Sequence, residues 1–255
     1  MSLKVEQFMC RSNNFGVILH DTESGETALV DAPEEHAIRA VLERTGWSPS
    51  LLLITHHHPD HVAGNLALKK RYGLTIVGPR GEAAKIPGLD RGVSEGDTVE
   101  FAGRRIEVIE TPGHTSGHIS YHIPEEKLAF VGDTLFALGC GRLFEEGPPV
   151  MLQSMKKLAA LPPETVVYCG HEYTLANARF ALTVEPDNEQ LTARARRIEA
   201  MREEGKPTLP TTIAEELATN PFLRWNSAGI RKTLGMEDAS EEEVFAEIRS
   251  RKDNF

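Results

Sequence analysis

The chain has 255 residues, 40% of them hydrophobic, and a formal net charge of −10 at pH 7. Its length and apolar content predict a folded protein with a substantial core, while the acidic balance argues against an extended surface for nucleic acid or anionic membranes. The N-terminus lacks an apolar h-region, and no apolar run approaches the roughly 20 residues that span a bilayer. We therefore expect a cytoplasmic protein that does not bind membranes.

The first two-thirds of the chain alternates between predicted strands and helices. Residues 15–21 and 27–32 form a predicted hairpin around the turn "TESGE". A helix that stops at Gly46 follows, and the buried strand "PSLLLIT" then runs into a histidine-rich segment. Beyond that segment we expect a helix ending at Gly73, a strand "LTIVG", and a series of strands over residues 97–131. This alternation predicts a layered α/β fold.

The last third of the chain differs in character. A helix "PVMLQSMKKLAAL" and a strand "TVVYCG" lead to Tyr173, and from there onward we expect helices and no strand. Two of the helices are predicted to begin with capping boxes, formed by Thr212 with Glu215 and by Ser240 with Glu243. The predicted division is an α/β domain of residues 1–172 and a helical domain of residues 173–255.

The segment "THHHPDH" has the composition of a metal-binding loop. His56 and His58 are two residues apart, so in extended backbone they point the same way and could bind one cation. Asp60 and His61 follow where the chain turns into a helix and would face a second cation. His57 lies between the two pairs, and we interpret it as structural.

Three later segments can complete the site, because each places a ligand where a strand gives way to a loop. His114 in "TPGHTSGH", Asp133 in "FVGDTLF" and His171 in "YCGHEYT" are these candidates. If Asp133 bridges both ions, each ion receives a set of four ligands. The first set is His56, His58, His114 and Asp133, and the second is Asp60, His61, His171 and Asp133.

Other polar residues have simpler interpretations. A lone histidine is more often a surface or satisfied core residue, and this applies to His20, His36 and His122. His118 could orient a ligand by hydrogen bonding. The three cysteines Cys10, Cys140 and Cys169 are odd in number and unrelated in spacing, so we interpret them as small buried hydrophobes.

These motifs together resemble the metallo-β-lactamase superfamily. The segments "GDTLFALGCGRLFE" and "YCGHEYTLANARFA" narrow the resemblance to glyoxalase II, the hydroxyacylglutathione hydrolases, over nearly the whole chain. The resemblance implies an αββα sandwich with a helical C-terminal domain, a binuclear centre and the same seven ligands. It also implies that Asp31 is a buried structural aspartate and that Arg142, Phe144, Tyr173 and Arg224 bind glutathione. The lysine that some members carry after that last arginine is absent here, and Arg231 or Lys232 could replace it.

The implied reaction is hydrolysis of S-D-lactoylglutathione to D-lactate and glutathione, the second step of methylglyoxal detoxification. Two divalent ions about 3.5–4 Å apart would lower the pKa of a bridging water toward 7, with Asp60 or Asp133 orienting the water. Zinc is the expected metal and iron or manganese are alternatives, because all three accept histidine and carboxylate ligands. We expect the protein to act on its small-molecule substrate as a monomer.

Other functions remain open from the sequence alone. A persulfide dioxygenase would use one iron and would normally lack the helical tail, whereas a β-lactamase or nuclease would lack "GCGRLFE". A non-catalytic protein with structural zinc is a further alternative. Structural zinc sites are usually closed and rich in sulfur, which the histidine and aspartate set here does not match.

Overall fold

The computed structural model describes residues 2–255. The chain divides into two compact units. The first comprises Met1–Glu110 and Gly117–Gly132, and the second comprises Thr111–Ser116 and Asp133–Phe255. The predicted boundary between residues 172 and 173 lies inside the second unit, and it stays a prediction.

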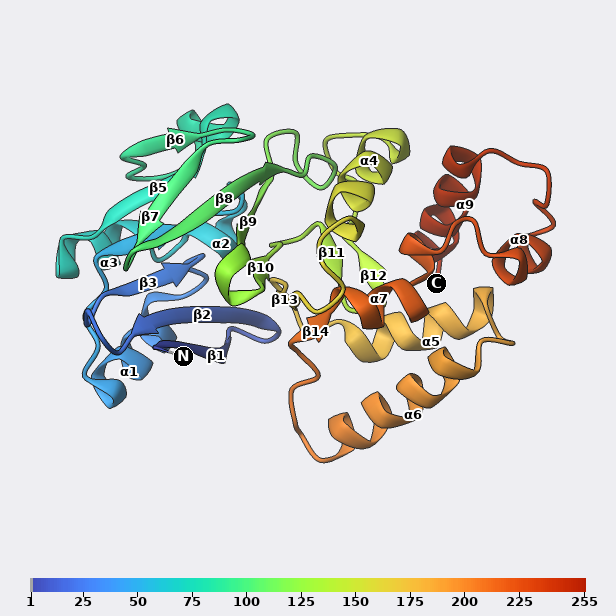
Figure 1. Cartoon of the computed structure of the whole chain (residues 1–255), viewed down its shortest axis with the longest axis horizontal. Helices are drawn as coiled ribbons and strands as arrows, with labels where there is room; N and C mark the ends of the chain where they lie inside the picture. The colour runs from blue at the N-terminus through green and yellow to red at the C-terminus, as the bar shows by residue number, and fades with distance from the viewer. Residues whose placement is uncertain (1) are drawn as a thin grey trace. The chain divides into compact units, whose positions relative to one another are not determined.

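A mixed sheet of the first unit follows the chain order (Figure 1). Its strands are β1 (Leu3–Cys10), β2 (Asn14–Asp21), β3 (Thr27–Val30), β4 (Leu51–Leu53), β5 (Thr75–Pro79) and β6 (Arg91–Val93). The first three strands pair antiparallel, and each later strand pairs parallel to the one before it. The predicted hairpin is confirmed as β2–β3. Strand β1 was not predicted, because its side chains are mostly half-buried and include charged residues.

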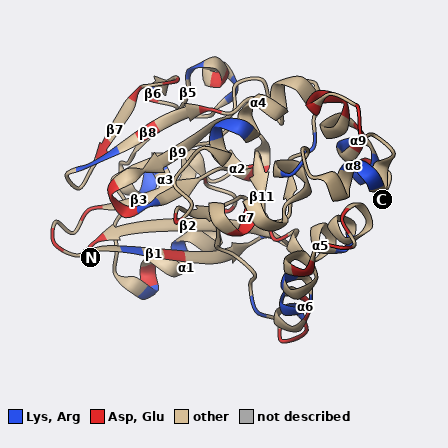
Figure 2. Ribbon diagram, turned by 45° about the vertical axis from the view of Figure 1, so that its right-hand side comes forward, with Lys and Arg blue, Asp and Glu red and all other residues tan. Residues whose placement is uncertain are grey.

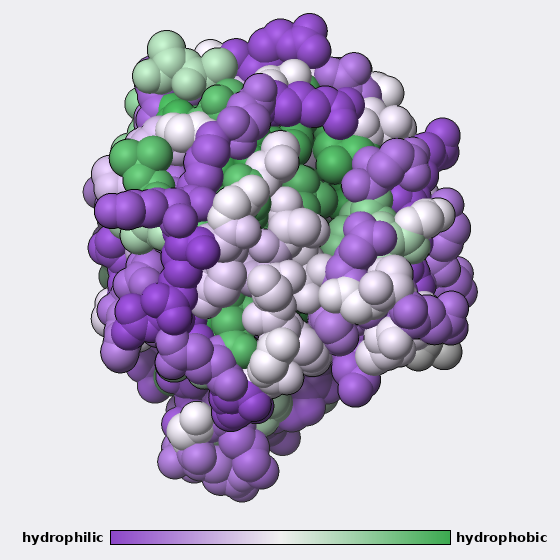
Figure 3. Space-filling model, turned by 90° about the vertical axis from the view of Figure 1, so that its left-hand side faces the viewer, coloured by the Kyte–Doolittle hydropathy of each residue, from purple (hydrophilic) through white to green (hydrophobic). Residues whose placement is uncertain are grey.

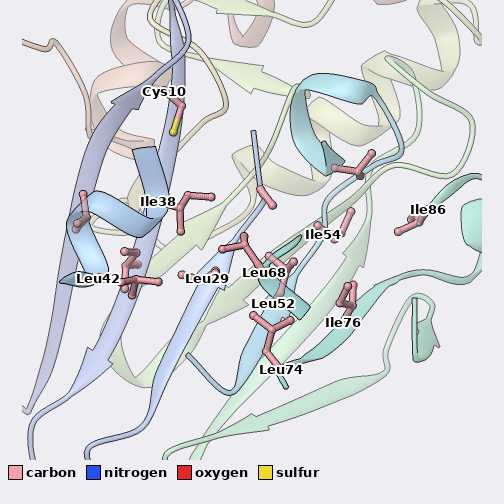
Figure 4. Packing of buried hydrophobic residues seen from close by; sticks show 14 residues of the cluster. Cys10, Leu29, Ile38, Leu42, Leu52, Ile54, Leu68, Leu74, Ile76 and Ile86 are labelled. Atoms are coloured by element: carbon pink, nitrogen blue, oxygen red, sulfur yellow. The ribbon is translucent and has the colours of Figure 1, made fainter. Parts of the chain in front are cut away.

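Helices α1 (Glu35–Thr45) and α3 (Asn65–Tyr72) pack on this sheet. In Figure 4, Ile38 and Leu42 of α1 lie over Leu29 and Leu52 of the sheet, and Leu68 of α3 belongs to the same buried cluster. Both helices end, as predicted, at glycines with positive φ, 75° at position 46 and 69° at position 73. The short helix α2 (Pro59–Val62) and the 3-10 helix η1 (Arg80–Lys85) lie in connections between strands.

A second group of strands in the first unit is antiparallel. It comprises β7 (Thr98–Phe101), β8 (Arg104–Glu110), β9 (Ile119–Ile123) and β10 (Leu128–Phe130), with the 3-10 helix η2 (Pro124–Glu126) before β10. Tyr121 of β9 is fully buried, and its hydroxyl donates a hydrogen bond of 2.8 Å to the carbonyl of Ile54, directly beyond β4. This bond fixes the backbone of the first sheet at the point where the histidine-rich loop begins.

The second unit is mainly helical. Its helices are α4 (Pro148–Ala159), α5 (Thr174–Val184), α6 (Glu189–Glu203), α7 (Ile213–Thr219), α8 (Ala228–Leu234) and α9 (Glu241–Asp253), with the 3-10 helix η3 (Pro221–Leu223). Its strands are the hairpin β11 (Leu135–Phe136) and β12 (Gly139–Cys140), and the pair β13 (Val166–Tyr168) and β14 (Thr211–Thr212). The expectation of no strand after Tyr173 was therefore wrong. The two residues of β14 pair with β13. A strand of two residues is too short to show the alternation of apolar and polar residues from which strands are predicted.

The predicted capping boxes have different outcomes. The box at Ser240 and Glu243 is complete, because each side chain binds the backbone N–H of the other residue. At α7 the Thr212 side chain accepts a hydrogen bond from the N–H of Glu215. The carboxylate of Glu215 instead contacts arginines of α6, Arg194 and Arg197. The Thr212 half of the predicted capping box is therefore present, whereas the Glu215 side chain forms ion pairs instead of binding the Thr212 backbone.

Charged residues of both signs alternate along the helices of the second unit, α6 most clearly (Figure 2). The face seen in Figure 3 is mainly hydrophilic with a smaller apolar area. Within residues 2–255, no helix has both the length and the apolar character needed to cross a bilayer.

Candidate metal centre

Four predicted ligands lie in the loop and helix that follow β4 in the first unit. His56 and His61 are buried, and their ring centroids are 4.1 Å apart. His56 Nε2 lies 3.1 Å from His58 Nδ1, so these two nitrogens face each other as the spacing predicted. Asp60 Oδ2 lies 3.9 Å from His61 Nε2 and accepts a hydrogen bond of 3.0 Å from the Asn14 side chain. The structure therefore brings these four side chains together.

Asp31 orients the rings of His61 and His56, the first by direct contact and the second through Thr55. It is buried and accepts hydrogen bonds from the backbone N–H and the hydroxyl of Thr55, at 2.8 and 2.9 Å. Its Oδ2 also lies 2.8 Å from His61 Nδ1, which must donate because a carboxylate only accepts. The Thr55 hydroxyl donates to Asp31 and so accepts from His56 Nδ1 at 3.1 Å. In both histidines the proton is thus on Nδ1, and Nε2 presents a lone pair suited to a metal ion.

The buried His118 lies beside this group. Its ring is stacked on that of His56, with the centroids 4.9 Å apart. A Cβ atom at Gly132 would lie 2.6 Å from His118 Nε2 and from the Thr55 hydroxyl, so a glycine leaves room for both. The ring of His118 thus packs on that of His56, and the hydrogen bond by which His118 was expected to orient a ligand stays a prediction.

Three predicted ligands lie together in the second unit. His114, Asp133 and His171 follow β8, β10 and β13 in the chain, and all three are buried. Asp133 Oδ2 lies 3.4 Å from His114 Nε2 and 3.2 Å from His171 Nε2. One carboxylate oxygen thus faces two imidazole nitrogens, which is the arrangement that a bridging ligand requires.

The turn after β12 supports this triad. His114 Nδ1 donates a hydrogen bond of 2.8 Å to the carbonyl of Arg142, so its Nε2 carries the lone pair. A Cβ atom at Gly141 would lie 1.9 Å from the carbonyl oxygen of Asp133, which excludes any residue but glycine there. The glycine of "GCGR" therefore allows the turn to approach both ligands.

Predicted substrate residues surround the same triad. Phe144 is 60% exposed and contacts the His114 ring edge to face, with centroids 5.2 Å apart. Tyr173 is 37% exposed and stacks on His171 at 4.8 Å. Arg142 is also exposed. Exposed aromatic and cationic side chains beside buried ligands are suited to holding an organic anion.

Arg224 has a partner within the helical region. Its guanidinium donates two hydrogen bonds of 2.8 Å to the carboxylate of Glu185, which is buried. These hydrogen bonds raise the pKa of Arg224. Burial opposes ionisation of Glu185, but bonds from Arg224, Asn188 and Ser227 lower the pKa of its carboxyl. The pair holds α5 to the segment after η3, and the predicted contact of Arg224 with glutathione stays a prediction.

The alternatives named for a second basic contact have different outcomes. Arg231 donates to the carbonyls of Trp225, Glu237 and Ala239, so it closes the turns around α8. Lys232 stays untested. Lys252 was not among the predicted site residues, and its pKa is lowered to about 8 by burial and by the positive charges of Arg249 and Arg142. The spacing of three residues between Arg249 and Lys252 predicts that they share one face of a helix. No local pattern in the sequence predicts that Arg142 lies near them.

Comparison with known proteins identifies the family. Residues 10–171 match the family model of the metallo-beta-lactamase superfamily, and residues 172–255 match that of the hydroxyacylglutathione hydrolase C-terminus. The hydroxyacylglutathione hydrolase of Mesorhizobium japonicum is 66% identical over 255 residues, all of both chains. The chain belongs to the hydroxyacylglutathione hydrolase family. This confirms the resemblance drawn from "GCGRLFE" and "CGHEYT".

Solved structures confirm the fold. ETHE1 from Myxococcus xanthus is 24% identical with a TM-score of 0.68, and the match covers 97% of this chain and 90% of that one. TTHA1623 in a di-iron-bound form is 25% identical with a TM-score of 0.62, over 86% of this chain and all of that one. The predicted metallo-β-lactamase fold with a helical C-terminal region is therefore confirmed.

The donor set fits divalent metal ions, as expected in this family. Imidazole nitrogens and carboxylate oxygens suit zinc, iron and manganese, and the described residues include histidine and aspartate groups that could hold an ion. The cysteines do not compete, because all three are free and buried. Burial raises the pKa of Cys10 and Cys169 to about 12 and that of Cys140 to about 11, so they stay protonated thiols.

A separate cavity in the first unit lies away from these ligands. It has a volume of about 540 Å³ and is lined by residues that include Leu51 and Thr75, the first residues of β4 and β5. The histidine-rich loop leaves the opposite, carboxyl end of β4. The cavity is therefore not the candidate site.

Proposed function

We propose that this protein hydrolyses the thioester of S-2-hydroxyacylglutathiones, with S-D-lactoylglutathione as substrate and D-lactate and glutathione as products. The 66% sequence identity to a hydroxyacylglutathione hydrolase, which extends over the full length of both chains, supports this proposal. The observation that carries it is that exposed aromatic side chains lie beside the buried group of His114, Asp133 and His171. The exposed rings of Phe144 and Tyr173 lie against ligand histidines there, where an acylglutathione could bind.

The proposed centre holds two divalent ions through the seven ligands that the sequence predicted. His56, His58 and His114 would bind one ion, Asp60, His61 and His171 the other, and Asp133 both. Zinc is the first candidate, and the di-iron form of TTHA1623 keeps iron and manganese as alternatives. When bound, such ions lower the pKa of a coordinated water and polarise the substrate carbonyl.

The remaining chemistry belongs to side chains of this protein. Asp60 or Asp133 would orient the attacking water, and Asp31 would keep His61 in the tautomer that binds metal. Attack of the water oxygen on the carbonyl carbon forms a C–O bond while an O–H bond of the water breaks and its proton passes to solvent, and the C–S bond then breaks. Glutathione leaves as a thiolate, and because a thiol has a pKa of about 8.5, no dedicated general acid is needed.

Substrate binding would use charge and ring contacts. Glutathione carries carboxylates, and guanidinium and ammonium groups bind them strongly. Arg142 and Lys252 are the cations that we propose for this role, because the positive charge of Arg142 helps to lower the pKa of Lys252, which places the two side chains near each other within the second unit. Phe144 and Tyr173 would pack against the peptide, while Phe144 has no hydroxyl to donate.

The persulfide dioxygenase alternative is not favoured. The likeness to ETHE1, at 24% identity, supports the shared fold alone, whereas the 66% identity to a hydroxyacylglutathione hydrolase covers the whole chain. A closed, sulfur-rich zinc site is also not favoured within residues 2–255, because the candidate ligands are histidines and aspartates and the three cysteines are buried free thiols.

Two further parts of the proposal concern the state of the protein. We propose that it works as a monomer in the cytoplasm. The three free cysteines agree with a reducing compartment, where thiols persist. Light scattering of the purified protein tests the monomer, since a dimer would double the mass.

Hydrolysis of S-D-lactoylglutathione by the metal-loaded protein tests the function. We expect the thioester absorbance to fall with wild type and Asp133→Ala to lower kcat by about 100-fold or more, because the ligand that would bridge both ions is lost. Asp97→Ala, a surface substitution in the first unit, is the control and should retain activity. Inactive wild type, or full activity in Asp133→Ala, would refute the proposal.

A further inference from the structure

A buried carboxylate outside the predicted ligand set lies behind the histidine-rich loop. Glu82 belongs to η1, between β5 and β6, and is 3% exposed. Its Oε2 accepts a hydrogen bond of 2.7 Å from the backbone N–H of His57 and lies 2.9 Å from His57 Nδ1. Its Oε1 accepts a hydrogen bond of 3.1 Å from the backbone N–H of Gly117. One carboxylate thus joins two loops of the first unit.

Both loops carry histidines of the candidate metal centre. His57 is the residue between His56 and His58, so the position of its backbone decides where both neighbouring rings point. Gly117 directly precedes His118, whose ring stacks on that of His56. The two segments meet again where the N–H of Ile119 donates to the carbonyl of Thr55. The Glu82 contacts therefore lie one residue away from each of three clustered histidines.

The approach of Glu82 depends on the absence of a side chain at position 117. A Cβ atom at Gly117 would lie 2.5 Å from Glu82 Cγ, closer than nonbonded carbons can come. A Cβ atom at Gly81 would lie 3.7 Å from the Cα of Gly117, an ordinary contact. The Glu82 side chain thus lies directly against the backbone of Gly117, and the N–H groups of His57 and Gly117 hold its two carboxylate oxygens.

A charged group in such a place constrains its surroundings. Burying a carboxylate is costly unless hydrogen bonds replace its water, and hydrogen bonds to a charged acceptor are stronger than neutral ones. Moving the His57 backbone would break one of these bonds within the protein interior. The carboxylate therefore favours a single conformation of the loop in the absence of any ion.

We propose that Glu82 is a positioning residue that preorganises His56 and His58 for metal binding through the His57 backbone, without contacting the ion. This explains why His57, which is not a predicted ligand, faces a buried carboxylate. The inference rests on the metal centre of the proposed function. It adds a determinant of metal affinity to the seven ligands.

Zinc affinity of the full chain, measured by competition with a chromophoric chelator, tests the proposal. We expect Glu82→Ala to bind zinc about 10–100-fold more weakly, as substitutions behind metal ligands do. Glu82→Gln should have an intermediate effect, because its single carbonyl oxygen can replace only one of the two acceptors. With zinc at saturation, the KM of Glu82→Ala for the thioester should stay unchanged, because Glu82 is not proposed to touch substrate.

Asp21→Asn is the matched control. Asp21 is also 3% exposed, lies in the same unit and accepts a backbone hydrogen bond, but from Ser24. Its substitution should lower stability without changing zinc affinity. Equal weakening in Asp21→Asn and Glu82→Ala would overturn the proposal, since the effect would then follow general destabilisation.

Gly117→Ala provides a second test if Glu82→Ala does not fold. It keeps the carboxylate but displaces it, so we expect zinc affinity to fall by a similar factor. Wild-type affinity in a folded variant of either kind overturns the inference. A wild-type protein that binds no zinc, iron or manganese would instead refute the proposed function.

Discussion

At the scale of single residues, Asp31 shows how the backbone prepares a ligand. Its φ of 56° is in the left-handed region, which non-glycine residues rarely adopt. This conformation accompanies three contacts, with the Thr55 N–H, the Thr55 hydroxyl and His61 Nδ1. Local strain of this kind persists where surrounding bonds enforce it. In return, Nδ1 of His56 and of His61 is engaged in a hydrogen bond, which leaves Nε2 of each ring for the proposed metal ion.

Lys252 leads to a prediction about pH. Because its pKa is lowered to about 8, its side chain is charged below that pH and neutral above it. If Lys252 binds a glutathione carboxylate, KM for the thioester should rise as pH increases through about 8. Steady-state kinetics from pH 7 to 9 measure this rise.

Two substitutions serve as controls for the pH dependence. Lys252→Arg keeps its charge throughout this range, so its KM should stay nearly constant. Lys252→Ala should show a raised KM, by about tenfold, even at pH 7 because one charge-assisted contact is worth roughly 1.5–3 kcal/mol in favourable cases. A wild-type KM independent of pH would remove Lys252 from the binding site.

At the scale of elements, the hairpin β11–β12 is held by polar side chains of the helical region. The N–H of Leu138 donates to Glu216 at 2.8 Å, and Asn220 Nδ2 donates to the carbonyls of Phe136 and Gly139, both at 3.0 Å. Asn177 Nδ2 donates to the carbonyl of Ala137. The hairpin connects Asp133 with Arg142, so helices α5 and α7 help to place a proposed metal ligand and a proposed substrate contact.

Glu216 is the centre of this network and its substitution should be strongly destabilising. It is fully buried and accepts hydrogen bonds from Arg194 at 2.5 Å, Thr211 at 2.7 Å and Asn220 at 2.9 Å. Glu216→Ala leaves the buried Arg194 guanidinium without its closest carboxylate, which should lower the free energy of unfolding by about 3–5 kcal/mol. Urea denaturation measures the change.

The exposed pair of Arg179 and Glu199 provides the comparison. Its atoms are 3.9 Å apart and both side chains are more than half exposed, so Glu199→Ala should change stability by less than about 1 kcal/mol. Similar losses for Glu199→Ala and Glu216→Ala would show that burial of the network is not what stabilises the hairpin.

At the scale of the whole molecule, the proposed ligands extend along the chain from residue 56 to residue 171. Each compact unit contains its own cluster, with oriented imidazoles in one and a shared carboxylate in the other. An ion that binds the folded chain but not the unfolded one must stabilise the fold. Metal content should therefore affect both stability and activity.

Metal removal tests this coupling. Dialysis of the loaded protein against a strong chelator should abolish thioester hydrolysis and lower Tm, and added zinc should restore both. At a free zinc concentration about 100 times Kd, the expected stabilisation is roughly 2.7 kcal/mol. Unchanged Tm after verified loss of metal would contradict a centre that depends on the folded chain.

The residue types and spacing of the proposed ligand set, and most of the elements around it, could be predicted from local rules. His56 and His58 face each other because alternation in extended backbone is a local rule, and the helix ends at Gly46 and Gly73 follow from local φ preferences. Asp133 could be predicted to meet two histidines because all three follow strands, where side chains of distant segments converge.

The partners of the long polar side chains could not be predicted, because they depend on how distant segments of the chain fold together. Arg224 binds Glu185, 39 residues away, and Lys252 lies within the influence of Arg142, although neither distance leaves a periodic signal. The pairing of β14 with β13 and the contacts of Glu82 with His57 and Gly117 likewise join segments that are distant in the sequence. Apolar periodicity and turn residues act over a few neighbours, whereas ion pairing and buried hydrogen bonding depend on which segments the folded core brings together.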